Sequence, residues 1–352
     1  MKSTKQSNLL RSVAFFALTA ALILTVCFTA SGFNETNDIP EDSAQLDEDN
    51  TLSPMPEKPS IPEYFDTLTG LPVDHTGTNA TNISFVLNSA DPLFGVGASK
   101  ITIEIPTENG ETRFVVHLDK TDLPGKIGSL SPTRDYINSF SSAFSDLIVS
   151  YGNDGRLNSE KTDSGFDMSE SLGYSYTEYT TYNYTNADLV LAGIRNLALT
   201  FNGECILPFS FANYGEEIQN SLRATRLSIS YSETNSTDLV YSSENGEYTL
   251  IKNGNTAIDL LSGKSLSYKN VFLLFSDSVT YESSEFTEMI LNTDSGTGLF
   301  LSNGTYQGFL WFRNESDELV FTTLEGQILE VNRGTSYIAI QKSSESKNIG
   351  II

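Results

Sequence analysis

The sequence predicts an α+β protein in which a mixed α/β sheet domain is followed by a β-rich domain. In the first half, segments rich in β-branched residues occur together with two segments of helical periodicity. In the second half, short strand-like runs recur about every ten residues between Gly-containing turns. With 352 residues, of which 39% are hydrophobic, the chain is long enough for two ordinary domains and a sizeable core.

The N-terminal residues 1–33 have the pattern of a signal peptide or membrane anchor. Three basic residues and no acid precede an uncharged apolar run over residues 13–30. Cys27 stands where a lipoprotein signal has its acylated cysteine, whereas the small residues 30–32 suit cleavage by a signal peptidase. Both routes stay open. The charge asymmetry around the run puts the remaining chain at the extracytoplasmic face of the cell membrane, which we expect it to contact through this anchor.

Residues 34–65 form an acidic, Pro-rich linker with few large apolar residues. Proline stiffens the chain and like charges extend it, so this segment is expected to act as a solvated spacer. The change from helix-containing to β-only patterns then divides the remaining chain into an N-terminal domain at 66–205 and a C-terminal domain at 206–345.

Three strands open the first domain, at residues 82–88, 100–106 and 111–118. Between the second and third of these strands, Glu108-Asn109-Gly110 supplies a tight turn, which predicts a hairpin.

A helix is expected after this hairpin. Ser131 can cap it, Pro132 suits its first position, and apolar residues recur every three to four positions from 137 to 147. This assignment places Arg134 in the first helical turn, where a cation is unfavourable. A buried strand at 146–151 and a second helix at 187–199 complete the domain.

The second domain is predicted to be almost entirely β. Asn245-Gly246 and Asn303-Gly304 each predict a hairpin. The expected strand-rich segments are 227–232, 238–254, 271–276, 298–314, 319–334 and 336–342.

Composition excludes several classes of function. A net charge of −24 disfavours nucleic acid as a partner. Two cysteines cannot form a disulfide framework, and two histidines, His75 and His117, give poor support for a catalytic zinc centre. We therefore expect no metal and no cofactor.

Several motifs, in order, resemble the YerB-like lipoprotein family, whose two domains are known only as the N- and C-terminal domains of unknown function 3048. They are TLTGLPVD at 67–74, KIGSLSPTRDYI at 126–137 and the segment from GTGLFLSNG to RGTSYIAI at 296–340. The resemblance covers roughly residues 66–342 and implies an exported two-domain lipoprotein without an established activity. Positions that carry histidine in the family pattern are here Ser150, Tyr182 and Ala257. A histidine-based reaction is therefore not expected of this chain.

The same resemblance points to Glu104, Glu108, Arg113 and Arg134 as site residues. The hairpin would bring Glu104 and Arg113 into one sheet, and Arg134 could meet either glutamate. Three interpretations stay open: structural ion pairs, a pocket for an anionic ligand, or a pair of catalytic carboxylates.

From these observations we expect a non-enzymatic protein that binds an envelope ligand or a cell-wall or envelope protein partner. The alternative is a cell-wall-directed hydrolase or transferase that uses a carboxylate/arginine site.

Overall fold

The computed structural model describes most of the chain after the N-terminal region, and residues 60–352 form one compact unit. The signal or anchor, Cys27, nearly all of the linker, and His75 lie outside the described residues. In the described part of the chain, no helix has the length and apolar character needed to cross a membrane. The described residues are 61–74, 81–145, 147–152, 165–167, 173–178, 182–199, 201, 205–282 and 287–352.

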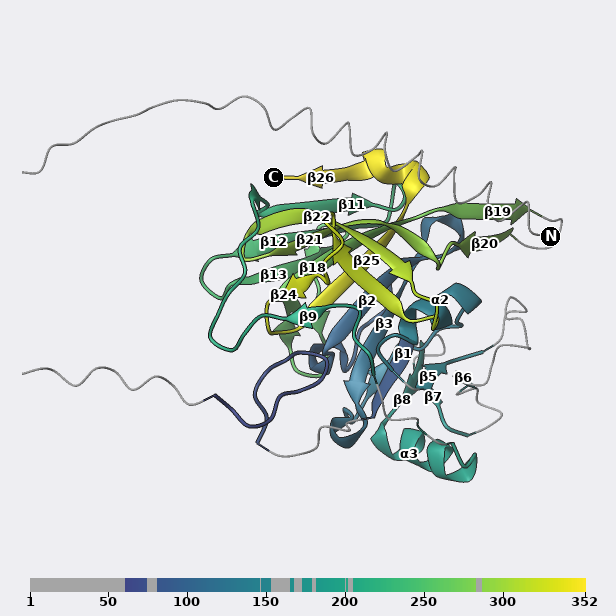
Figure 1. The fold of residues 1–352 in the computed structure, drawn as a ribbon. Helices are drawn as coiled ribbons and strands as arrows, with labels where there is room; N and C mark the ends of the chain where they lie inside the picture. The colour runs from purple at the N-terminus through teal and green to yellow at the C-terminus, as the bar shows by residue number, and fades with distance from the viewer. Residues whose placement is uncertain are drawn as a thin grey trace, which may run out of the picture. The chain divides into compact units, whose positions relative to one another are not determined.

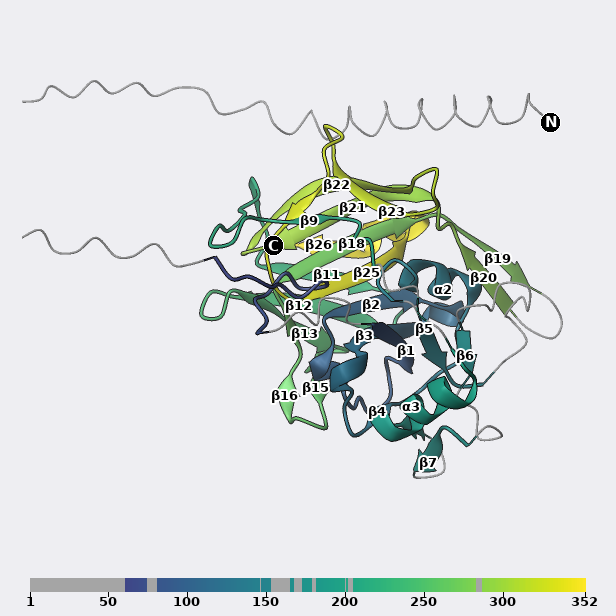
Figure 2. The ribbon, with the colours of Figure 1, turned by 60° about the horizontal axis from the view of Figure 1, so that its bottom comes forward.

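A mixed sheet of eleven strands runs through the described unit. Figure 2 shows its strands in succession from β22 to β6. Most neighbours are antiparallel, but β25 pairs in parallel with both β18 and β2, and β5 with both β1 and β6. In sheet order the strands are β10 (Leu222–Arg223), β22 (Thr305–Arg313), β21 (Ser295–Ser302), β18 (Asn270–Ser276), β25 (Ser336–Lys342), β2 (Ile101–Pro106), β3 (Thr112–Asp119), β1 (Asn82–Asn88), β5 (Leu147–Ser150) and β6 (Gly165–Asp167), with β23 (Leu319–Thr323) beside β22.

An antiparallel sheet of six strands forms a second layer; its strands β11, β12 and β13 are labelled in Figure 1. In order it contains β14 (Asn255–Thr256), β13 (Glu247–Lys252), β12 (Ser236–Ser242), β11 (Arg226–Ser230) and β26 (Ile349–Ile351), with β17 (Ser267–Tyr268) beside β13. Smaller ladders are β4 (Ile127–Gly128), β8 (Tyr182–Thr185) and β7 (Tyr176–Glu178); β15 (Ile258–Asp259) and β16 (Lys264–Ser265); β19 (Ser278–Glu282) and β20 (Thr287–Leu291); and β9 (Ser210–Phe211) and β24 (Glu330–Val331).

Two α-helices lie in the described residues, α2 (Asp135–Ser141) and α3 (Ala187–Asn196). Short 3₁₀ helices are η2 (Val96–Ala98), η3 (Glu108–Gly110), η4 (Lys120–Asp122) and η7 (Ser343–Asn348). The fold is therefore mostly β with few helices, and the predicted mixed sheet followed by a β-rich part is confirmed.

The large sheet has a hydrophobic cluster on each face because its strand residues alternate in direction. Ile103 and Ile105 of β2 pack in the cluster that contains α2, whereas Phe114 of β3 packs in the cluster that contains α3 and the six-stranded sheet. Glu104, between the two isoleucines, therefore points toward the six-stranded sheet. This alternation decides where the acidic side chains of β2 and its turn can go.

The first helix begins later than the sequence predicts. Residues 131–134 stay extended, because Ser131 N donates to Val86 O (2.9 Å) and Tyr151 N donates to Ser131 O (3.1 Å). Arg134 is then the N-cap residue with an extended backbone, and α2 begins at Asp135. The expected position of Arg134 inside the first turn is wrong, although its charge still lies at the N-terminal end of the helix.

The large sheet draws strands from both predicted domains. β2 and β25, separated by more than 200 residues, pair in parallel over Ile101–Glu104 and Ser336–Ala339. The boundary at residue 205 stays a prediction, but the hydrogen bonding of the sheet is continuous from one side of it to the other.

Candidate functional site

Glu104 lies at the centre of a buried polar network between the two sheets. Its side chain is fully buried and accepts hydrogen bonds from groups of four other strands. These donors are Thr112 Oγ1 (2.9 Å), Thr237 Oγ1 (2.7 Å), Lys252 Nζ (2.5 Å) and Tyr337 Oη (2.5 Å). The network ties β2, β3 and β25 of the large sheet to β12 and β13 of the six-stranded sheet.

The charge state of Glu104 follows from these contacts. Burial alone would raise its pKa, but the Lys252 ammonium and the hydrogen bonds from Lys252, Tyr337 and Thr237 outweigh burial and hold the pKa below its usual value. Burial and the negative charge of Glu104 hold the pKa of Tyr337 and Tyr231 well above the usual value. The lowered pKa and the pairing with Lys252 favour the ionised carboxylate, and a general acid must instead carry a proton.

Glu108 and Arg134 form a second buried pair, on the α2 side of the large sheet. Arg134 Nε donates to Glu108 Oε1 (3.2 Å) and Arg134 Nη2 donates to Glu108 Oε2 (2.9 Å), a two-point contact. Their exposed fractions are 6% and 3% for Glu108 and Arg134. Met289 N of β20 also donates to Glu108 Oε1 (3.4 Å), so this pair joins the β2–β3 turn to the start of α2 and to the second half.

Arg113 forms a third, separate contact. Arg113 Nη1 lies 3.3 Å from Glu111 Oε2, whose side chain is 65% exposed. Arg134 was expected to meet either Glu104 or Glu108. The structure pairs it with Glu108. The four predicted site residues do not form one cluster, because Glu104 lies on the other face of the sheet with Lys252 and Arg113 pairs with Glu111.

His117 is buried in the core below α2. Its Nδ1 lies 3.0 Å from Ile101 O and its Nε2 lies 3.2 Å from Ser141 Oγ. The ring is also packed edge-on against Phe144 at 5.5 Å between centroids. With no exposed surface, this serine–histidine contact is structural.

Burial lowers the pKa of His117 to about 4, against a usual value of 6.5. Between these values the unfolded chain binds a proton that the native chain does not, so the free energy of unfolding should fall as pH decreases from 6.5 to 4 and then level off. The full effect is about 3 kcal/mol. We expect His117→Gln to lose this part of the acid destabilisation, measured by urea unfolding at several pH values. Wild-type and variant curves that stay parallel from pH 7 to pH 4 would contradict this assignment.

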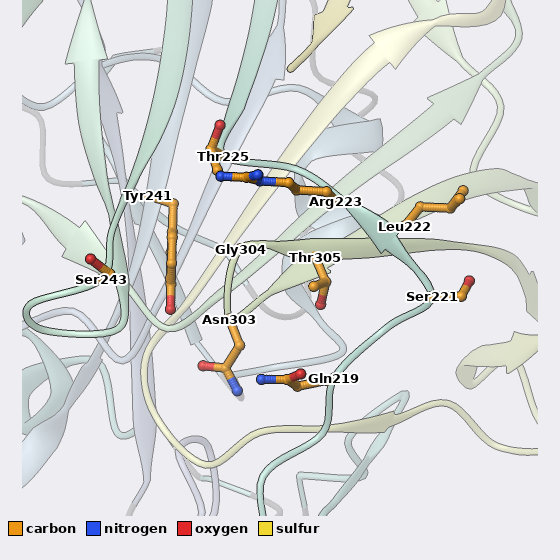
Figure 3. A pocket seen from close by; sticks show the side chains of 10 residues that line it. All are labelled: Gln219, Ser221, Leu222, Arg223, Thr225, Tyr241, Ser243, Asn303, Gly304 and Thr305. Atoms are coloured by element: carbon orange, nitrogen blue, oxygen red, sulfur yellow. The ribbon is translucent and has the colours of Figure 1, made fainter. Parts of the chain in front are cut away.

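An open groove that sequence reasoning missed lies where β10 meets the β21–β22 turn. It has a volume of about 510 Å³. Figure 3 shows Arg223 on one side and the amides of Gln219 and Asn303 on the other, with Thr305 between them. The Asn303-Gly304 turn was predicted as a hairpin, and the pairing of β21 with β22 confirms it. The sequence held no signal that residues 219–225 lie against this turn.

Local geometry fixes the floor of the groove. Asn303 Nδ2 donates to Glu217 Oε2 (3.0 Å) and to Ile218 O (3.1 Å), while Asn303 Oδ1 accepts from Lys269 Nζ (2.7 Å). Gly304 has φ 69°, and a Cβ there would lie 2.9 Å from ring carbons of Tyr241. The turn therefore needs glycine both for its backbone conformation and for its close approach to Tyr241.

Comparison with known proteins shows which family model and which solved structure this chain is similar to. Residues 227–338 match the family model of the C-terminal domain of DUF3048, a protein of unknown function. No curated protein matches the chain. The fold is similar to the crystal structure of the YerB protein from Bacillus subtilis, with a TM-score of 0.69 and 17% sequence identity over 82% of this chain and 100% of that chain. These matches confirm the resemblance inferred from the sequence motifs: residues 227–338 are similar to the DUF3048 C-terminal domain, and the fold is similar to that of YerB.

Proposed function

We propose that the protein is an extracytoplasmic, membrane-tethered protein that binds an envelope ligand or protein partner and catalyses no reaction. The observation that favours a non-enzymatic role over the hydrolase or transferase alternative is the state of the two candidate carboxylates. Glu104 is paired with Lys252 and Glu108 with Arg134, and each pair is buried. A reaction through paired carboxylates requires both groups to face one pocket with separated pKa values.

The arrangement weighs against the hydrolase or transferase alternative. Glu104 lies between the two sheets, whereas Glu108 lies on the α2 side of the large sheet. The ligand-binding role of Glu104, Glu108, Arg113 and Arg134 stays a prediction. The groove near Arg223 offers the accessible polar surface that a binding function needs.

The tether is supported by the basic N-terminus, the apolar run over residues 13–30 and the acidic linker after it. We expect the chain to sediment with membranes and to be degraded by protease added to intact protoplasts. Recovery of the chain in the cytoplasmic soluble fraction, protected from protease, would contradict this localisation.

The chemistry of the tether can be tested with the two cysteines of the chain. A fatty-acid label that enters wild type and Cys205→Ser but not Cys27→Ser would identify acylation of Cys27. Cys205 is a suitable control because its Sγ lies in the folded body, 3.3 Å from Ala143 O. If the chain is bound to membranes but takes up no label, the uncleaved apolar segment over residues 13–30 is its anchor.

A further inference from the structure

We propose that the groove near Arg223 binds a saccharide that carries a single carboxylate. This inference rests on the proposed binding function and specifies the ligand class of that function.

The charge of the groove favours an anion. Arg223 is exposed and, among the described residues, its guanidinium forms no ion pair and no hydrogen bond. It is the one charged residue of the lining. Lys269, next to the floor, is neutralised by Glu217 at 3.0 Å. In a chain of net charge −24, a lone guanidinium in a hollow is a site for one carboxylate, which it can bind through two parallel hydrogen bonds.

The remaining lining is neutral and polar. Gln219, Ser221, Ser243 and Tyr241 carry amide or hydroxyl groups whose side chains make no hydrogen bond within the described structure. Amides and hydroxyls can both donate and accept. Sugar hydroxyls require both roles from their partners, so this wall suits the part of a ligand that surrounds its carboxylate.

The floor is held in place before any ligand arrives. Besides the three contacts of Asn303, Thr305 Oγ1 donates to Ser302 O (2.9 Å) and accepts from Asn220 N (2.9 Å). A rigid floor lowers the ordering cost of binding. A volume of about 510 Å³ lies within the usual range for small-ligand pockets.

A protein partner fits this groove less well. The centre of a protein interface is enriched in aromatic and apolar side chains. Here Leu222, 48% exposed, is the one large aliphatic side chain of the lining. The Tyr241 ring packs against Gly304 and lies 5.2 Å from the Tyr248 ring, so it is already engaged within the protein.

The test compares two disaccharides that differ by one carboxylate-bearing group. Calorimetric titration of the full chain in detergent would use N-acetylglucosamine–N-acetylmuramic acid, which has a lactyl carboxylate, and chitobiose, which has none. We expect the acidic disaccharide to bind about tenfold or more tightly. Arg223→Ala should reduce its affinity to that of chitobiose, and Arg223→Lys should retain part of the difference.

Arg195→Ala is the matched control, since Arg195 is also exposed but lies on α3. It should leave both affinities unchanged. Equal affinity for the two disaccharides, absence of binding to both, or an Arg223→Ala variant that binds like wild type would overturn the proposal. Binding of triglutamate as tightly as the acidic disaccharide would overturn the saccharide assignment in favour of an acidic peptide.

Sedimentation with detergent-washed cell walls, which hold no membrane for the tether to enter, separates this inference from the proposed function. Wild-type chain that sediments with these walls, together with an Arg223→Ala variant that sediments equally, would reject the groove while leaving the binding function in place. Wild-type chain that does not sediment with the walls and is not captured by any envelope fraction freed of membrane would reject the binding function itself.

Discussion

Replacing Lys252 with methionine is expected to lower the free energy of unfolding by about 3–5 kcal/mol, because it leaves the fully buried carboxylate of Glu104 without its cation. The pKa of Glu104 should rise at the same time, since burial then opposes ionisation with less compensation. Urea unfolding at pH 7 measures the loss of stability. Repeating it at pH 5 should show a smaller loss, because a protonated Glu104 avoids the buried charge.

The matched control is the double variant Glu104→Gln/Lys252→Met. Removing both charges together should restore most of the stability that the single variant loses, since a buried ion pair contributes little beyond compensating its own desolvation. If Lys252→Met costs less than about 1 kcal/mol, as an exposed ion pair would, Lys252 and Glu104 do not form the buried pair described here.

Replacing Trp311 with alanine is expected to cost about 3–5 kcal/mol, because it opens a cavity in the core. Trp311 is 1% exposed, its ring lies 5.6 Å from that of Phe140 on α2, and its Nε1 donates to Thr297 O at 3.1 Å. This side chain of the second half thus packs against a helix of the first half. Trp311 is the one tryptophan of the chain, so the variant has no tryptophan fluorescence with which to follow unfolding. Urea unfolding is therefore followed by far-ultraviolet circular dichroism.

Trp311→Phe should cost clearly less than Trp311→Ala, because the ring keeps most of its contacts with Phe140. Phe312→Ala is the exposed neighbour control; the Phe312 side chain is 38% exposed and should tolerate the change better. An alanine variant at Trp311 that is as stable as the one at Phe312 would contradict the packing described for this part of the sheet.

Local sequence signals predicted the hairpins well. Asn109 and Gly110 have φ values of 62° and 71°, and Asn303 and Gly304 have 51° and 69°, which are the conformations that Asn and Gly tolerate. The start of α2 was harder to predict. Ser131 and Pro132 are good helix-start residues, but Ser131 is held extended by hydrogen bonds to β1 and Tyr151, and such tertiary contacts override local preference.

At the candidate site, too, local contacts could be predicted from the sequence and tertiary contacts could not. A contact between Arg134 and Glu108 could be expected, because Glu108 lies in the turn after β2 and Arg134 lies directly before α2. Strand alternation is enough to place Glu104 on the face opposite its isoleucine neighbours. What covers that face could not be predicted, because Lys252 lies 148 residues further along the chain and reaches Glu104 only through the stacking of two sheets. Arg223 and the Asn303-Gly304 turn are likewise joined by tertiary structure alone.

We propose that Glu104 and Glu108 stabilise the fold and that the ligand binds in the groove near Arg223. This is tested most directly by measuring how much purified Glu104→Gln/Lys252→Met chain sediments with detergent-washed cell walls, which hold no membrane for the tether to enter, under conditions where circular dichroism shows it to be folded. We expect the same fraction as for wild type. A folded double variant that no longer sediments would contradict the claim and return Glu104 to the binding site.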